Sequence, residues 1–176
     1  MAEPPITRAL RIRPALYVDF EAIWPIFRAV VATGTTYLFS PDTPREDAFD
    51  YWFGAGVTCY VVEDDGRVVG MYKLVRNQRD LGAHVANASF MVEPSCQGRG
   101  AGRAMALHCL RQARRAGFAA MQFNFVVSTN TAAVALWRAL GFEVVGTLPR
   151  AFQHRQLGYV DAYVMHRFLD DIDPSE

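Results

Sequence analysis

The stretch "ASFMVEPSCQGRGAGRAMALHCL", residues 88–110, joins an apolar, strand-like segment to a helix-like one through a cluster of glycines. Gly98, Gly100 and Gly102 occupy alternate positions there, beside Arg99 and Arg103. The apolar residues that follow recur at the spacing of one helix face. The stretch therefore predicts a strand that leads into a helix through an unusually bare backbone.

Such a junction is a candidate anion site. The first N–H groups of a helix lack partners within it, the helix dipole is positive at that end, and glycine lets a bulky anion approach. The chain lacks the Gly-Lys-Ser/Thr of a nucleoside triphosphate loop, and Arg103 stands where the dinucleotide fingerprint needs glycine. The residues indicate a phosphate or pyrophosphate cradle of another kind, with a plain tight turn as the alternative.

Strands and helices can be placed along the rest of the chain. We expect strands over 9–15, 84–94, 119–127, 142–148 and 159–169, and a hairpin over 57–77 that turns at Asp65-Gly66. Helices are expected over 19–33, 45–55, from the glycines to Gly117, and over 130–141. Asp19 should cap the first helix, Pro25 should kink or divide it, and Thr43 with Glu46 should form a capping box before the second. This order predicts a mixed α/β sheet with helices on both sides.

Composition narrows the functional class. The 18 Lys+Arg balance 18 Asp+Glu, which argues against a nucleic-acid surface. The three cysteines show no CxxC spacing, so we expect no metal and a reduced, cytoplasmic location. The start lacks the pattern of a signal peptide, and there is no uncharged apolar run of about 18 residues, so we expect no membrane partner.

A second motif supports the first. "NTAAVALWRALGF", residues 130–142, is an Asn-led helix that ends in an aromatic residue, three further residues and Gly-Phe. Together with Gln97-x-x-Gly100-x-Gly102 it resembles the GNAT superfamily, the GCN5-related N-acetyltransferases, and the order of elements matches from about residue 8 to 169. The resemblance implies one N-acetyltransferase domain over 1–176 with an ordered core of roughly 8–169. It also implies the GNAT fold, a mixed, mostly antiparallel sheet of about seven strands flanked by helices on both faces.

The resemblance implies acetyl-CoA as co-substrate. The strand residues Phe90, Met91 and Val92 would pair with the pantetheine arm, and one of their N–H groups would polarise the thioester carbonyl. Asn130, Ala133 and Trp137 would line the other side of the groove, and Asn130 can also cap its helix. The pyrophosphate would lie on the backbone N–H groups of Gly98, Arg99, Gly100, Ala101, Gly102 and Arg103, and Gln97 begins the same cofactor-binding loop.

The catalytic groups are less clear from sequence. An alkylammonium must lose its proton before attack, so a base is expected on the strand before the loop, with His84 and, less strongly, Glu93 as candidates. Asn87 cannot take a proton but can orient water or the acceptor. Trp137 stands where the family commonly has a tyrosine that acts as general acid for the departing CoA thiolate. Either the thiolate leaves unaided, or another tyrosine (Tyr37, Tyr159 or Tyr163) donates, or the enzyme is impaired.

The acceptor side rests on the loop after the first helix and on the segment joining the last two strands. Tyr37, Phe39 and Phe152 are expected to wall the pocket, and Arg150, His154 or Arg155 to meet a carboxylate. The leading hypothesis is an N-acetyltransferase for a small amine or amino acid, and the resemblance allows a homodimer. The alternatives are acetylation of a protein N-terminus or lysine, and a non-catalytic acyl-CoA-binding module.

Overall fold

The computed structural model describes residues 10–175, which form one seven-stranded sheet in the order β1-β2-β3-β4-β5-β7-β6. The strands are β1 (Arg11–Pro14), β2 (Thr58–Asp64), β3 (Arg67–Arg76), β4 (Val85–Val92), β5 (Ala120–Val127), β6 (Glu143–His154) and β7 (Gly158–Phe168). The α-helices are α1 (Phe20–Ala32), α2 (Arg45–Phe53), α3 (Ala101–Arg115) and α4 (Thr131–Ala139), with short 3-10 turns at Tyr17–Asp19, Asp80–Gly82 and Pro94–Cys96. The predicted fold class and order of elements are confirmed.

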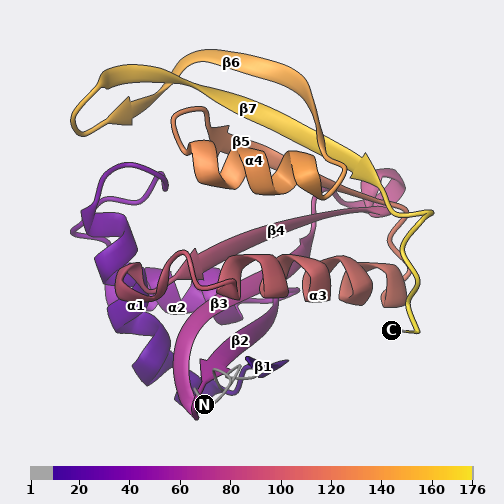
Figure 1. Ribbon diagram of the computed structural model, residues 1–176, viewed down its shortest axis with the longest axis horizontal. Coiled ribbons are helices and arrows are strands. Elements are labelled where there is room, and N and C mark those ends of the chain that lie inside the picture. The colour runs from indigo at the N-terminus through magenta and orange to yellow at the C-terminus, as the bar shows by residue number, and fades with distance from the viewer. Residues whose placement is uncertain (1–9, 176) are drawn as a thin grey trace, which may run out of the picture.

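The sheet is split between β4 and β5. These two strands are parallel and pair only at Val85↔Ala120 and Ala86↔Met121, whereas every other neighbouring pair is antiparallel. Beyond Ala86, β4 continues to pair with β3, and β5 pairs with β7, so the two halves of the sheet diverge (Figure 1). The carboxyl-terminal half of β4 therefore has one free edge.

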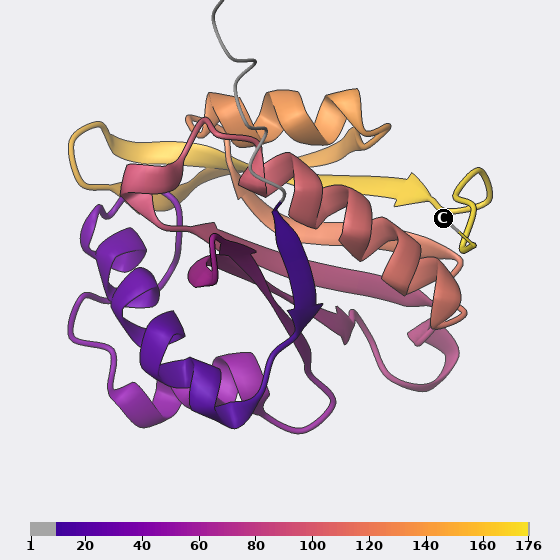
Figure 2. The same cartoon turned by 60° about the horizontal axis from the view of Figure 1, so that its bottom comes forward.

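Helices cover both faces of the sheet (Figure 2). One buried cluster joins α3 and α4 to side chains such as Tyr72 and Met165, and the other joins α1 and α2 to Val61 and Met91. The alternation of β4 explains the division, because successive side chains of a strand point to opposite faces. Ala88 lies in the first cluster and Met91 in the second. None of the helices within residues 10–175 is both long and apolar enough to span a membrane.

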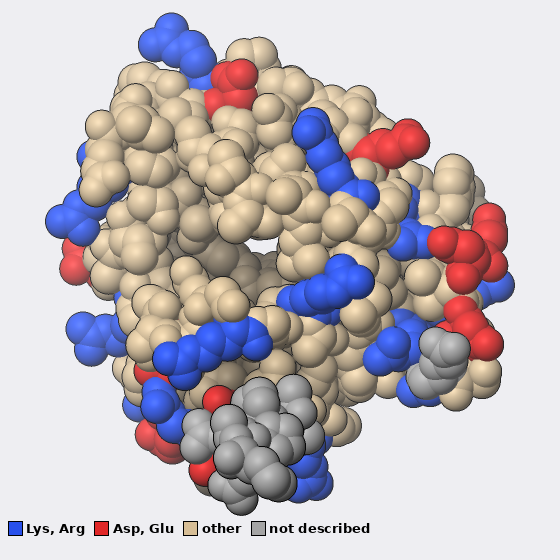
Figure 3. Space-filling model, viewed as in Figure 1, with Lys and Arg blue, Asp and Glu red and all other residues tan. Residues whose placement is uncertain are grey.

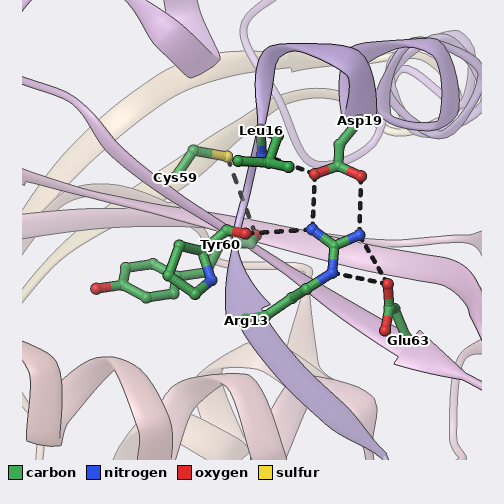
Figure 4. A network of polar contacts seen from close by, with 7 residues as sticks. Arg13, Leu16, Asp19, Cys59, Tyr60 and Glu63 are labelled. Carbon is green, nitrogen blue, oxygen red and sulfur yellow. Dashed lines mark hydrogen bonds and ion pairs between the residues drawn. The ribbon is translucent and has the colours of Figure 1, made fainter.

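An ion-pair network ties β1 to β2 and to the start of α1 (Figure 4). The Arg13 guanidinium binds both carboxylate oxygens of Asp19, at 2.7 and 2.9 Å, and Glu63 Oε1 at 2.7 Å. Asp19 Oδ2 also accepts from the Leu16 N–H. The hydrogen bond from Arg13 holds the pKa of Asp19 below its usual range. Asp19 precedes α1 as predicted, but its carboxylate bonds Arg13 and Leu16 rather than capping the helix.

Two features of the helices differ from expectation. Pro25 lies inside α1 without dividing it, and the carbonyl that loses its partner belongs to Glu21, an exposed residue that solvent can satisfy. The capping box before α2 does not form. The helix begins at Arg45 after Pro44, and Thr43 Oγ1 instead donates to the Ser40 carbonyl at 2.6 Å.

The final hairpin is longer than predicted. β6 runs through to His154 and pairs with β7 up to His154↔Gly158, with an irregularity between Leu148 and Phe152. Most of the segment predicted as a connecting loop is therefore strand. At the other boundary, residues 8 and 9 of the expected core lie outside the described residues, and Ile172 packs against the core beyond residue 169.

Candidate active site at the split in the sheet

Two cavities flank the split between β4 and β5. The glycine-loop cavity, about 620 Å³, is lined by Gln97, Gly98, Gly100–Arg103, Leu136 and His154 among others. The aromatic cavity, about 310 Å³, is lined by Phe39, Tyr51, Asn87, Ser89, Asn124 and Phe125 among others. Both are also lined by the residues that we call the junction: Thr36, Tyr37, Phe90, Asn130, Ala133 and Trp137. In Figure 3 a hollow passes through the molecule where Figure 1 places the gap between α3 and α4.

The glycine loop presents open backbone to its cavity. Gly98 and Gly100 have φ of 76° and 87°, and a Cβ added at either would meet no atom within 4 Å. Gly100 is the residue that precedes α3, so the first amides of this helix face the cavity without intrahelical partners. Arg103 lines the cavity, whereas Arg99 is exposed beside it. The arrangement can hold an anion on backbone N–H groups.

The free edge of β4 faces the junction. Glu93 N–H donates to the Val69 carbonyl, so the alternation of an antiparallel ladder directs Met91 N–H to β3 as well, and Phe90 and Val92 N–H to the split. Tyr37 Oη occupies the Phe90 edge: it accepts from Phe90 N–H at 3.0 Å and donates to the Phe90 carbonyl at 2.5 Å. Of the three predicted backbone contacts, Met91 therefore turns its amide away from the groove.

The start of α4 forms the opposite wall. Asn130 Oδ1 accepts from Ala133 N–H at 3.3 Å, which caps the helix, and the two residues also line both cavities. Trp137, one helical turn further, packs its ring against Phe90 and Phe123 at centroid distances of 5.0 and 4.6 Å. Its side chain is 8% exposed. Trp137 is thus both core and junction wall.

The two predicted bases lie away from the junction. His84 precedes β4 at the end where the sheet is still closed, and six strand residues put it about 20 Å from Phe90. Its imidazole is exposed and bonds the Leu81 carbonyl. Glu93 is paired with Arg67 and accepts from Cys96 Sγ. Neither residue lines either cavity, so both assignments as base are corrected.

The predicted acceptor residues divide into two groups. Tyr37, Phe39 and Asn87 line the aromatic cavity as expected. Phe152 does not, because the extended β6 buries it against Phe125 and His154. The three residues expected to meet a carboxylate also lie elsewhere. Arg150 stacks over Tyr159, Arg155 donates to the Ala32 carbonyl, and His154 lines the glycine-loop cavity instead.

Sequence reasoning missed three polar residues of the aromatic cavity, namely Tyr51, Ser89 and Asn124. Tyr51 Oη and Ser89 Oγ form a hydrogen bond of 2.6 Å. The period of two along β4 would have indicated Ser89, since it shares a face with Asn87. Asn124 lies where the β5–β7 register shifts, between Phe123 and Val126, and no local sequence signal marks that irregularity.

The aromatic cavity is electrically neutral. Within residues 10–175, its lining includes no Asp, Glu, Lys, Arg or His side chain. Lys73 contacts the lining residue Tyr51 from outside the cavity and donates to its carbonyl at 2.9 Å. Burial lowers the pKa of Lys73 to about 8. Burial also raises the pKa of Tyr37 and of Tyr51. The described residues contain no cluster of three or more His, Cys, Asp or Glu that could hold a metal ion.

Comparisons with known proteins agree with this geometry. N-acetyltransferase aca1 of Schizosaccharomyces pombe is 30% identical over 162 residues, which cover 82% of this chain and 78% of that protein. A GCN5-related N-acetyltransferase from Kribbella flavida superposes with a TM-score of 0.87 at 46% identity, over 91% of this chain and 98% of that one. The structure of yncA from Salmonella typhimurium, solved with its cofactor acetyl-CoA, gives a TM-score of 0.79 at 26% identity, over 94% and 98%.

The family model adds the boundaries. Residues 20–142 match the model of the acetyltransferase (GNAT) family, a range that contains both the glycine loop and the α4 motif. The split between β4 and β5 lies within the same range. The chain therefore belongs to the GNAT family of N-acetyltransferases.

Proposed function

We propose that the protein transfers an acetyl group from acetyl-CoA to the amine of a small molecule or amino acid, by direct attack in a ternary complex. The observation that carries the proposal is the meeting of two cavities at one shared wall. One is built from helix-terminal amides and suits an anionic cofactor, and the other is built from aromatic and amide side chains. A nucleophile in one cavity can reach a thioester in the other without crossing the sheet.

The residues of the glycine-loop cavity fit an acyl-CoA. Gly98 and Gly100 leave open the space that side chains would fill, and the first amides of α3 can receive a pyrophosphate beside Arg103. The Val92 N–H on the free edge of β4 can pair with the pantetheine arm. Acetyl-CoA supplies an activated acetyl thioester when it is bound there.

The reaction needs no covalent enzyme intermediate. The amine nitrogen attacks the thioester carbon, so that a C–N bond forms while the C–S bond breaks and its electron pair leaves on sulfur. The proton of the attacking amine is lost to water. Among the described residues, the lining of the aromatic cavity includes no carboxylate, imidazole or amine, and its tyrosines Tyr37 and Tyr51 stay protonated because burial raises their pKa, so the acceptor must react as the free amine. We expect kcat/KM to rise with pH and to follow the pKa of the acceptor, which is near 10 for an alkylamine.

Tyr37 is the group best placed to assist the leaving thiolate. Its hydroxyl lies at the junction and bonds the Phe90 backbone. Burial raises the pKa of Tyr37, so the hydroxyl stays protonated, and its single proton can pass from the Phe90 carbonyl to the sulfur or to the thioester oxygen when the thioester is bound. Trp137 can donate a hydrogen bond but does not release its indole proton. We assign it the role of a packing wall.

The size of the aromatic cavity, about 310 Å³, supports a compact acceptor rather than an extended peptide. The test is a panel of amines, amino acids and peptide N-termini, each incubated with acetyl-CoA. Release of the free thiol of CoA is measured with a colorimetric thiol reagent. Turnover of small amines or amino acids above that of peptides supports the proposal. Turnover of peptides alone would replace it with protein acetylation, and acetyl-CoA binding without any turnover would indicate a binding module.

A further inference from the structure

We infer that His154 binds the acyl-CoA, by donating from Nε2–H to an amide carbonyl oxygen of the pantetheine arm. This inference rests on the proposed function. His154 is the last residue of β6 and pairs with Gly158 across the turn to β7. His154 lines the glycine-loop cavity, although it belongs to β6 and is far from the glycine loop in sequence.

The turn fixes the tautomer of the imidazole. Nδ1 accepts two backbone N–H groups, from Gln156 at 3.1 Å and from Leu157 at 3.2 Å. A ring nitrogen that accepts hydrogen bonds carries no proton, so the proton resides on Nε2. The Nδ1 edge faces the turn, and the opposite edge, with Nε2–H, is left for the cavity.

His154 as a whole is buried, but its Nε2 is accessible. His154 is 8% exposed, and among the buried side chains of residues 10–175 it is the one outside the apolar, aromatic and cysteine types. Among the described residues, both hydrogen bonds of the ring go to Nδ1, and Nε2 is not one of the fully buried side-chain atoms that lack a partner, so it stays accessible from the cavity. A ligand acceptor in the cavity would complete the pairing.

The neighbouring residue holds the ring in place. Arg155 N–H donates to the Gly34 carbonyl at 3.0 Å, and Arg155 Nη1 donates to the Ala32 carbonyl at 2.9 Å. Both carbonyls follow or end α1, so the hairpin tip is fastened to the loop that carries Tyr37 (Figure 1). His154 is therefore a preset donor on a fixed turn.

The chemistry of acyl-CoA selects the acceptor atom. The loop amides and Arg103 can satisfy the pyrophosphate charges, whereas the pantetheine arm brings amide carbonyls that can each accept a hydrogen bond from a single N–H. An imidazole N–H matches such a carbonyl. Replacement of His154 should therefore lower the affinity for ligands that carry the pantetheine arm and leave the affinity for ligands without it unchanged.

Two variants separate binding from structure. In His154→Asn, Oδ1 takes the place of Nδ1 and still accepts from the turn, but nothing reaches the Nε2 position. In His154→Gln, the side-chain amide reaches that position. We expect His154→Asn to raise the Kd of acetyl-CoA about three- to tenfold, as for one lost hydrogen bond, and His154→Gln to restore it to about twofold of wild type.

Calorimetric titration of acetyl-CoA and of 3′-phospho-ADP, with the unliganded Tm of each variant, provides the readouts. The inference requires that His154→Asn keeps the wild-type Tm and loses affinity for acetyl-CoA but not for 3′-phospho-ADP. It also requires that His154→Gln regains the affinity for acetyl-CoA. Equal acetyl-CoA affinity in wild type and His154→Asn, equal losses for both ligands, or a loss that His154→Gln does not restore would overturn it. Failure of wild type to bind acetyl-CoA would instead overturn the proposed function.

Discussion

The two cavities that meet at the split are built in opposite ways. The glycine-loop cavity takes one wall from neighbouring residues of the segment 97–103, whose backbone N–H groups we propose as the anion site. The aromatic cavity is assembled from side chains of the loop at 36–39, of α2, of β4 and of β5. A backbone site tolerates any acyl-CoA, whereas a side-chain site defines which amine can enter. The first is therefore expected to set cofactor affinity and the second to set acceptor choice.

The strongest test of this division is Gly100→Val. Gly100 has φ of 87°, where a β-branched residue is strained, and the side chain would project toward the cavity. We expect the Kd of acetyl-CoA to rise at least about a hundredfold, which is about 2.7 kcal/mol. Gly66→Val is the matched control, since Gly66 has φ of 75° with equally open space but lies in the β2–β3 turn. Equal loss of acetyl-CoA affinity in both variants would refute the loop assignment.

Tyr37→Phe tests the junction itself. Loss of the hydroxyl should lower kcat roughly ten- to a hundredfold, at the lower end of general-acid effects because a thiolate leaves readily. The Kd of acetyl-CoA should change little. Tyr51→Phe is the control, because that hydroxyl bonds Ser89 within the aromatic cavity and does not line the other one. If Tyr37→Phe keeps wild-type kcat, the thiolate leaves unaided.

Asn87→Ala tests the acceptor side. Asn87 lines the aromatic cavity only, and its Oδ1 accepts from Ala88 N–H. We expect the KM of the acceptor to rise about three- to tenfold, as for one lost hydrogen bond, with the acetyl-CoA Kd unchanged. An increase in both constants would show that the two cavities do not divide the substrates in this way.

His84→Ala should have the smallest effect. Its imidazole is exposed on the closed side of the split, so kcat and the dependence of kcat/KM on pH should stay within about twofold of wild type. A loss of kcat/KM near neutral pH in this variant, recovered as the pH approaches the pKa of the acceptor amine, would restore His84 as the base, contrary to its position in the sheet.

How far the sequence predicted each cavity follows from the same contrast. The loop at 97–103 and the helix at 130–142 could be predicted from the sequence because their residues are consecutive and their spacing is set by helix geometry. His84 was misplaced because strand residues spread over about 3.4 Å each, so proximity in sequence is not proximity in space. Phe152 and His154 were misassigned because the length of β6 depends on pairing with β7. Asn124 and Tyr51 become neighbours of the site only through tertiary packing.

The claim that both substrates meet at one junction is tested most directly by initial velocities over a matrix of acetyl-CoA and acceptor concentrations. The acceptor is the best amine of the panel above. A ternary complex predicts double-reciprocal lines that intersect, with no acetylated protein after incubation with acetyl-CoA alone. Parallel lines together with an acetyl-enzyme would contradict direct transfer and require a nucleophile on the protein.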